Sequence, residues 1–294
     1  MYSTRMMSNL LVQLLILLVS SLVCWSQECN TNEEVYKEVD RPSSCKEILD
    51  KYPATPSGYY YLKTSKVYCD MDTEHCGSKG WTRVAHVDMS NKLQSCPGDL
   101  NLITSPIHTC GGLTTPGCAS AKFSTHGISY SKVCGRVRGY QVGETNAFGP
   151  YVNDQGNPGL VMDGILISHG QKQSHIWAYV TGFQRQASDE LNYYCPCADY
   201  RFNGVVPSFI GNDYYCDSGV DSSPQKGIFY TTPLWNGKGC TPPNFCCSHS
   251  GMPWFCKTLP VPTTDYIELR NCQNNNGGVI SEDTAVELME LYVK

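Results

Sequence analysis

Cysteine is the residue type that most constrains this chain, because its number and spread indicate a fold held together by disulfide bonds. The sequence contains 17 cysteines. An apolar run over residues 10–19, preceded by Arg5 as the only charged residue, is typical of a secretion signal with a cleavage site after Ser26. A signal anchor that stays attached is the alternative. Cleavage removes Cys24 and leaves an even number of cysteines, which predicts complete disulfide pairing in an oxidising compartment.

The charge balance narrows the range of partners. The net charge of the whole chain is −5 at pH 7, and it becomes −6 when Arg5 leaves with the signal. Binding to nucleic acid needs clustered Lys and Arg, and the sequence has no such cluster. No second apolar stretch approaches the roughly 18 residues of a membrane span. We therefore expect a secreted, extracellular protein with no nucleic-acid partner and no membrane span after signal removal.

The first part of the mature chain is predicted to contain a short helix and a few strands. Residues 27–41 are polar and predict a flexible lead. Residues 44–50 predict a helix, because Ser44-x-x-Glu47 fits a capping box. Aromatic and β-branched residues then predict short strands over residues 59–62, 66–71 and 81–87.

This segment resembles the opening of fibrinogen-related domains, such as those of ficolins and intelectins. The resemblance is carried by Cys45-Lys46-Glu47-Ile48, Ser57-Gly58-Tyr59-Tyr60, Val67-Tyr68-Cys69-Asp70-Met71 and Gly80-Trp81-Thr82. It implies a small fibrinogen-like α+β N-terminal subdomain over residues 42–90, with a Cys45–Cys69 disulfide and a small sheet packed around Trp81. The sequence departs from the family pattern at Cys76, and the later segments that hold the family's ligand pockets are not visible. Whether the subdomain folds alone or docks on the rest is left open.

Residues 96–294 predict a cysteine-rich β domain. Strand-like runs over 160–168 and 175–180 flank a polar link and predict a hairpin. Further strands are predicted over 266–270 and 286–293, joined by the Asn- and Gly-rich loop 274–278. With no long amphipathic helix evident, the fold class is mainly β, and the best fit is a disulfide-rich β-sandwich with long loops.

This second unit resembles a cysteine-rich extracellular module found in exported proteins of simple marine animals. Some of those proteins resemble uncharacterised components of a skeletal organic matrix. The resemblance is carried by residues 123–127, 133–136, 207–214, 253–256 and 282–284. It implies an extracellular setting but no particular activity.

Oxygen-rich and aromatic residues around Cys216 are the candidates for ligand binding. Asp213, Asp217 and Asp221 recur at four-residue intervals, and hard oxygen ligands on a pinned loop would suit calcium. The alternative is that these aspartates only form turns. Tyr214 and Tyr215 lie in the same loop and are candidates for contact with a glycan or a protein, with strand packing as the alternative.

The sequence offers little for other metals or for catalysis. His169 and His175 flank the predicted hairpin link and could face one ion, but no third ligand is indicated, and two exposed loop histidines are the alternative. Ser124 and His126 are the candidates for a scattered catalytic site, although a polar strand end explains them as well. The common hydrolase motifs are missing from the sequence. We expect no enzymatic activity and no cofactor other than calcium.

Two functions follow from these observations. The first is a secreted, non-enzymatic extracellular matrix or adhesive structural protein, for which the resemblance implies a mineralised skeletal organic matrix. The alternative is a soluble glycan-binding lectin of the fibrinogen-related type. The expected partners are extracellular matrix proteins, glycans or a mineral surface.

Overall fold

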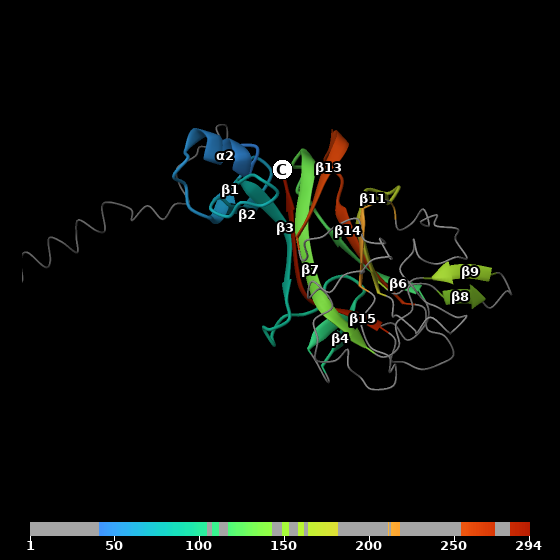
Figure 1. Cartoon of the computed structure of the whole chain (residues 1–294). Helices are drawn as coiled ribbons and strands as arrows, with labels where there is room; N and C mark the ends of the chain where they lie inside the picture. The colour runs from blue at the N-terminus through green and yellow to red at the C-terminus, as the bar shows by residue number, and fades with distance from the viewer. Residues whose placement is uncertain are drawn as a thin grey trace, which may run out of the picture.

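The protein is described by a computed structural model of the chain, shown in Figure 1. The structure describes residues 41–104, 108–111, 117–142, 149–152, 158–161, 164–181, 211, 213–217, 254–273 and 283–294. The predicted signal peptide, nearly all of the predicted lead, the loop 274–278 and Asp221 lie outside these residues. Within them the chain is mainly β, as predicted.

Eight strands form a large sheet. Its path runs β1-β2-β3-β15-β5-β4, and β7 pairs with both β15 and β13. The strands are β1 (Gly58–Tyr61), β2 (Lys66–Asp70), β3 (Trp81–Asp88), β4 (Asn101–Ile103), β5 (Thr109–Gly111), β7 (Tyr130–Val142), β13 (Trp254–Thr263) and β15 (Asp283–Val293). β15 lies between β3 and β7 and pairs with both in antiparallel register, so it is the central strand of this sheet.

Five strands form a second, smaller sheet in the order β12-β11-β10-β14-β6. They are β6 (Gly117–Phe123), β10 (Gly164–His169), β11 (Ser174–Thr181), β12 (Tyr214–Asp217) and β14 (Ile267–Gln273). β8 (Gly149–Val152) and β9 (Pro158–Val161) pair separately. The predicted hairpin is confirmed, because β10 and β11 are antiparallel neighbours, but residues 160–161 of its first predicted strand belong to β9 instead. The two predicted C-terminal strands are also confirmed, but β14 and β15 belong to different sheets.

The hydrophobic core fills the space between the two sheets. Ala85, Val133 and Leu291 of the large sheet share one buried cluster with Ile167 and Leu269 of the small sheet. In the same cluster the rings of Trp177 and Phe255 stack with centroids 4.9 Å apart and planes 9° apart. The arrangement is consistent with the predicted disulfide-rich β-sandwich.

One buried polar pair also links the sheets, through β14 and β15. Asn271 donates from Nδ2 to the Thr284 carbonyl at 2.7 Å, and Thr284 Oγ1 donates to Asn271 Oδ1 at 2.5 Å. The pair satisfies both buried side chains. Gly111 lies against it, because a Cβ there would be 2.6 Å from the Thr284 carbonyl oxygen and 2.8 Å from Asn271 Nδ2.

The predicted N-terminal helix is present as α2 (Cys45–Lys51). Ser44 is its N-cap, and its hydroxyl accepts from the Glu47 amide at 3.2 Å, as the capping box predicts. The Glu47 carboxylate bonds the amide and hydroxyl of Ser43, one residue earlier than the motif implies. The Cys45–Cys69 disulfide then fastens α2 to β2 over a small apolar cluster. Figure 1 shows α2, β1 and β2 at one end of the sandwich.

The two predicted units share one sheet. β3, from the segment with the fibrinogen-like resemblance, pairs with β15, from the far end of the chain. The Cys76–Cys256 disulfide joins the same two parts of the sequence. The N-terminal segment is therefore docked on the second unit by backbone pairing and by a covalent bond.

Four disulfides occur among the described residues, and one cysteine there is a free thiol. The bonds are Cys45–Cys69, Cys76–Cys256, Cys96–Cys110 and Cys118–Cys272. Cys134 is buried and free, so the prediction of complete pairing is wrong at this position. The reason is local: Cys134 lies opposite Cys256 across the β7–β13 ladder, and Cys256 is already bonded to Cys76.

Candidate functional site on the outer face of the large sheet

The outer face of the large sheet, which turns away from the core, carries polar and aromatic side chains in two cross-strand rows. Row one runs through Tyr59, Tyr68, Arg83, Tyr292, Cys134 and Cys256 on β1, β2, β3, β15, β7 and β13. Row two runs through His86, Glu290, Arg136 and Trp254 on β3, β15, β7 and β13. Strands lie about 4.8 Å apart, so neighbours in a row touch.

The loop between β2 and β3, residues 71–80, folds over one end of this face. Its His75 ring stacks on Trp254 with centroids 4.1 Å apart and lies 5.2 Å from Tyr292. Trp81, Cys134 and Tyr292 form a small buried cluster of their own, with Trp254 packed against it. The loop therefore closes a second, minor core on the outside of the sandwich.

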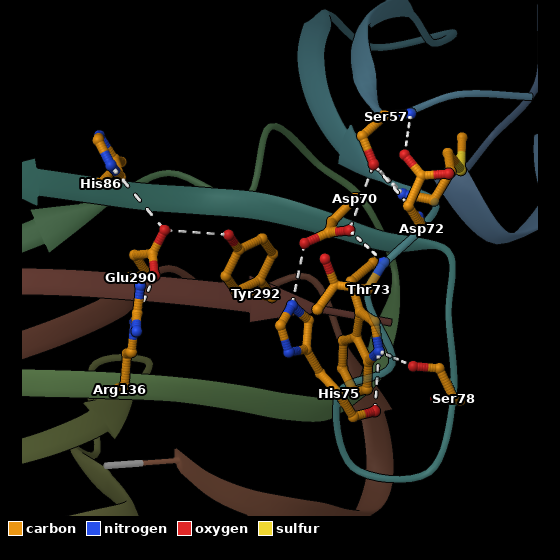
Figure 2. Close-up of polar contacts among 12 residues, drawn as sticks. Ser57, Asp70, Asp72, Thr73, His75, Ser78, His86, Arg136, Glu290 and Tyr292 are labelled. Carbon is orange, nitrogen blue, oxygen red and sulfur yellow. Dashed lines mark hydrogen bonds and ion pairs between the residues drawn. The ribbon is translucent and has the colours of Figure 1, made fainter.

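The imidazole of His75 is held by the buried carboxylate of Asp70. His75 Nε2 donates to Asp70 Oδ2 at 3.0 Å, and both side chains are nearly inaccessible to water (Figure 2). Asp70 Oδ1 accepts from the Thr73 amide at 3.0 Å and the Ser57 hydroxyl at 3.3 Å. Burial alone would raise the pKa of Asp70, but the hydrogen bonds from Thr73 and His75 outweigh it and lower that pKa.

The loop backbone is fixed from the other side by Trp81. Its indole Nε1 donates to the Ser78 carbonyl at 2.8 Å and to the His75 carbonyl at 3.1 Å. Between them the chain turns through Cys76 and Gly77 with φ values of 51° and 71°. Left-handed backbone is costly for a cysteine, and the Cys76–Cys256 bond holds it there.

Row two is an ion-paired stripe centred on Glu290. Arg136 Nε donates to Glu290 Oε2 at 2.6 Å, and the Tyr292 hydroxyl donates to Oε1 at 3.3 Å. His86 Nε2 lies 3.9 Å from the same Oε1 (Figure 2). The Arg136 guanidinium also lies 5.2 Å from the centroid of the Trp254 ring. The charged side chains of row two therefore contact one another.

The other end of row one, on β1 and β2, is open to solvent. Tyr59 is 63% exposed, and its ring meets Tyr68 edge-on with centroids 5.4 Å apart. The Arg83 guanidinium carbon lies 3.9 Å from the centroid of the Tyr68 ring. Two residues along β1, Tyr61 has Lys66 Nζ 5.0 Å from its ring centroid. This end of the face presents cations on aromatic rings to solvent.

The chemistry available at the covered end is limited by burial. Burial raises the pKa of the Cys134 thiol, so little of it is thiolate at neutral pH. His75 is enclosed between rings and bonded to Asp70. Among the residues that the structure describes, no group of three or more His, Cys, Asp and Glu could hold a metal ion. The covered end therefore fixes the loop, whereas the open end presents exposed side chains to solvent.

Of the predicted calcium residues, Asp213 directly precedes β12 of the small sheet and Asp217 ends that strand. The Asp213 carboxylate pairs with Lys257, and its carbonyl accepts from His175 Nε2 at 2.8 Å. The side chain of Asp217 and all of Asp221 lie outside the described residues, so calcium binding stays a prediction. Tyr214 is buried in β12, at 5% exposure, whereas the side chain of Tyr215 is not described. Contact of these tyrosines with a ligand also stays a prediction.

The two histidines of the hairpin do not face one another. His169 Nδ1 bonds Asp265 Oδ2 at 3.1 Å, while His175 bonds the Asp213 carbonyl and lies opposite Ser168. Adjacent residues of a strand point to opposite faces, so His169 and His175 point away from each other. Burial lowers the pKa of His175, which favours its neutral form. At the other predicted pair, Ser124 Oγ accepts from the His126 amide at 3.0 Å, a local turn.

The sequence did contain a signal for the open end of row one. Tyr59, Tyr61, Lys66 and Tyr68 occur at even spacing within two short strands, which places them on one face. The contribution of Arg83 depended on the register of a third strand. The covered end had no such signal, because it depends on β15 and β13.

Comparison with known proteins gives no match: no family model, no curated protein and no solved structure is significantly similar to this chain. No helix in the described part of the chain is long and apolar enough to cross a membrane.

Proposed function

We propose that this chain is a secreted, non-enzymatic structural or adhesive protein of the extracellular matrix. The observation that carries the proposal is the disulfide framework. Cys76–Cys256 and Cys118–Cys272 each join positions more than 150 residues apart in sequence, 180 and 154 respectively. Bonds of this kind persist in oxidising compartments outside the cell and are rare in the cytosol.

The arrangement of reactive groups supports a scaffold role over catalysis. The one free thiol in the described residues is buried, and burial raises its pKa. His75 and Asp70 hold a loop in place, and Glu290, Arg136 and His86 engage one another across the sheet. These groups stabilise the surface by contacting one another. Within the two described rows, none of them forms a nucleophile–base pair that is free to react.

The more specific part of the proposal, the subdomain type and the kind of matrix, rests on sequence resemblance. The segment over residues 42–90 would be a fibrinogen-like subdomain, and the module over 96–294 would place the protein in a mineralised skeletal organic matrix. The Cys45–Cys69 bond and the buried Trp81 are features that the resemblance implies, and they support this assignment.

The test determines in which extraction fraction the native protein is recovered. Tissue is extracted first with physiological buffer, then with chaotrope, and the remaining mineral is dissolved with a chelator. The chain is quantified in each fraction by mass spectrometry of peptides from the 254–273 region. Recovery in the chaotrope or mineral fraction supports a matrix protein, whereas recovery of nearly all of it in buffer contradicts one. The N-terminal peptide of the same material would show whether cleavage occurs after Ser26.

A soluble lectin is the second candidate, and the exposed Tyr59 beside Arg83 is the observation that favours it. Exposed tyrosines with nearby polar groups are common in binding surfaces. A glycan array probed with and without calcium tests this candidate, because the predicted aspartate site would make binding calcium-dependent. No signal in either condition, from protein recovered in the soluble fraction, would exclude it.

A further inference from the structure

The outer face of β1, β2 and β3 carries a compact group of tyrosines and cations, which we call the tyrosine–cation strip. Its members are Tyr59, Tyr61, Lys66, Tyr68 and Arg83. Tyr59, Tyr68 and Arg83 are register partners in one row, and Tyr61 and Lys66 are partners in the next. β1 is the edge of the large sheet in the described structure, so the strip lies at an open margin.

The geometry of Arg83 is that of a preorganised anion receptor. Its guanidinium lies 3.9 Å from the Tyr68 ring centroid, close enough for stacking, and its Nη2 is 3.5 Å from the Tyr59 hydroxyl. Stacking fixes the plane of the guanidinium while most of its five N–H donors stay available. No carboxylate pairs with Arg83 among the residues that the structure describes. Asp70, two residues along β2 from Tyr68, is bonded to His75.

The rings of the strip contact one another and the nearby cations. Tyr59 meets Tyr68 edge-on, and the Tyr61 ring has two cations near it, with Lys66 Nζ at 5.0 Å and the Arg41 guanidinium carbon at 5.2 Å from its centroid. Tyr59 keeps 63% of its surface exposed. A flat, exposed ring with few rotatable bonds loses little conformational entropy when a ligand packs on it.

Charge selects the class of ligand. The strip is basic, although the chain as a whole carries −5, so a polyanion would be drawn to this margin and repelled elsewhere. The backbones of Tyr59 and Arg83 lie two strands apart, about 10 Å, but their side chains converge, with Arg83 Nη2 3.5 Å from the Tyr59 hydroxyl. A ligand that uses both must combine a face that packs on a ring with an anionic group directly beside that face.

We propose that the tyrosine–cation strip binds an acidic saccharide chain, with a sugar ring on Tyr59 and a sulfate or carboxylate on Arg83. The inference deepens the proposed adhesive function and rests on it, because it names what the extracellular protein would hold. The exposed Tyr59 ring takes the apolar C–H side of a sugar, and the Arg83 guanidinium takes the anion in a bidentate hydrogen bond.

The test measures binding of the full mature chain to three octasaccharides by isothermal titration. The probes are sulfated chondroitin, the same chain without sulfate but with its carboxylates, and neutral chito-octaose. We expect the sulfated or the desulfated chain to bind, with affinity that falls as salt rises, and chito-octaose to bind at least about tenfold more weakly. The comparison of the first two shows which anion Arg83 recognises.

Variants distinguish binding at the tyrosine–cation strip from general electrostatic attraction to the protein. Arg83→Ala should weaken binding about tenfold, and Tyr59→Ala about fivefold, while Arg83→Lys should fall between wild type and Arg83→Ala because it keeps the charge and loses the planar donors. The matched control is Lys122→Ala, since Lys122 Nζ also lies 5.0 Å from a tyrosine ring, that of Tyr266, but on the small sheet. It should change the affinity less than twofold.

Several results would overturn the inference: no binding of either acidic chain, equal binding of the neutral chain, or an equal loss for Arg83→Ala and Lys122→Ala. Tyr59 is exposed, so Tyr59→Ala tests the site even if an Arg83 variant folds poorly. The partition experiment is independent of this one. A matrix protein with no affinity for acidic saccharides would leave the proposed function standing and end this inference alone.

Discussion

Replacing both Cys76 and Cys256 with alanine should lower the free energy of unfolding by about 4 kcal/mol. The sequence separation of 180 suggests a larger loss, because the cost of closing a loop grows with its length. Cys118–Cys272 and Cys96–Cys110, however, remain closed in the variant and provide a shorter covalent path between the two positions.

The length of that covalent path determines how much unfolding free energy the variant loses. It runs along residues 76–96, crosses the Cys96–Cys110 bond, continues over 110–118, crosses Cys118–Cys272 and returns over 272–256. The ring contains roughly 45 residues, for which the chain-entropy relation gives about 4 kcal/mol at 25 °C. Cys118–Cys272 belongs to the same ring, so removing it alone should cost the same amount. When both bonds are removed, the second opens a larger loop than the first, so the total loss should exceed the sum of the two separate losses, about 8 kcal/mol.

Equilibrium urea unfolding followed by tryptophan fluorescence measures these losses. The variants are C76A/C256A, C118A/C272A and the quadruple replacement, each compared with the unaltered chain. Removing a bond expands the unfolded state, so the slope of free energy against urea should rise along the series.

Two results would refute the reasoning about a shared ring. One is a difference of more than about 2 kcal/mol between the two double variants, since a common ring gives them equal losses. The other is a quadruple variant that loses less than the sum of the two.

Three further predictions follow from the buried contacts. The pKa of Asp70 is lowered from its ordinary 3.8 in the folded state. Its contribution to the free energy of unfolding is therefore complete above about pH 5 and is lost as the pH falls through the lowered value. Asp70→Asn should thus flatten the decline of stability to urea between pH 5 and pH 2. A steeper decline in the variant would contradict this. Gly135→Ala should destabilise by about 1–3 kcal/mol, because the new Cβ would lie 2.7 Å from a backbone oxygen of β15, whereas Gly58→Ala, with its nearest neighbour at 3.7 Å, should cost less than about 0.5; equal thermal shifts would contradict it. Cys134 should resist iodoacetamide at pH 8 in the native protein and react on denaturation, as peptide mapping would show; rapid native labelling would contradict its burial.

Local features of the fold were readable from the sequence because their causes are local. The capping box predicted α2 to within one residue, and two strand-like runs around a polar link predicted the β10–β11 hairpin. The tyrosines of β1 and β2 could be placed on one face from their spacing alone. In each case the residues that form the element are neighbours in the chain.

The covered end of the outer face could not be predicted, because its residues come together through long-range register. Tyr292 reaches Cys134 and Arg83 only because β15 inserts between β3 and β7. The free thiol has the same origin: an even count predicted a partner for every cysteine, but Cys76 and Cys134 lie near the same Cys256, and only one can bond to it. Pairing of this kind is set by three-dimensional proximity, which spacing does not contain.

The central place of β15 also sets the order in which the chain can fold. β3 and β7 do not pair with each other, so each keeps an open edge until a segment synthesised roughly 140 to 200 residues later arrives between them. Long-range pairing of this kind is slow, and open strand edges tend to aggregate in the interval. During that interval the thiol of Cys134 is accessible to oxidation. A Cys134–Cys256 bond formed in that interval would have to be exchanged for Cys76–Cys256, so we expect the yield of native protein to depend on disulfide isomerisation.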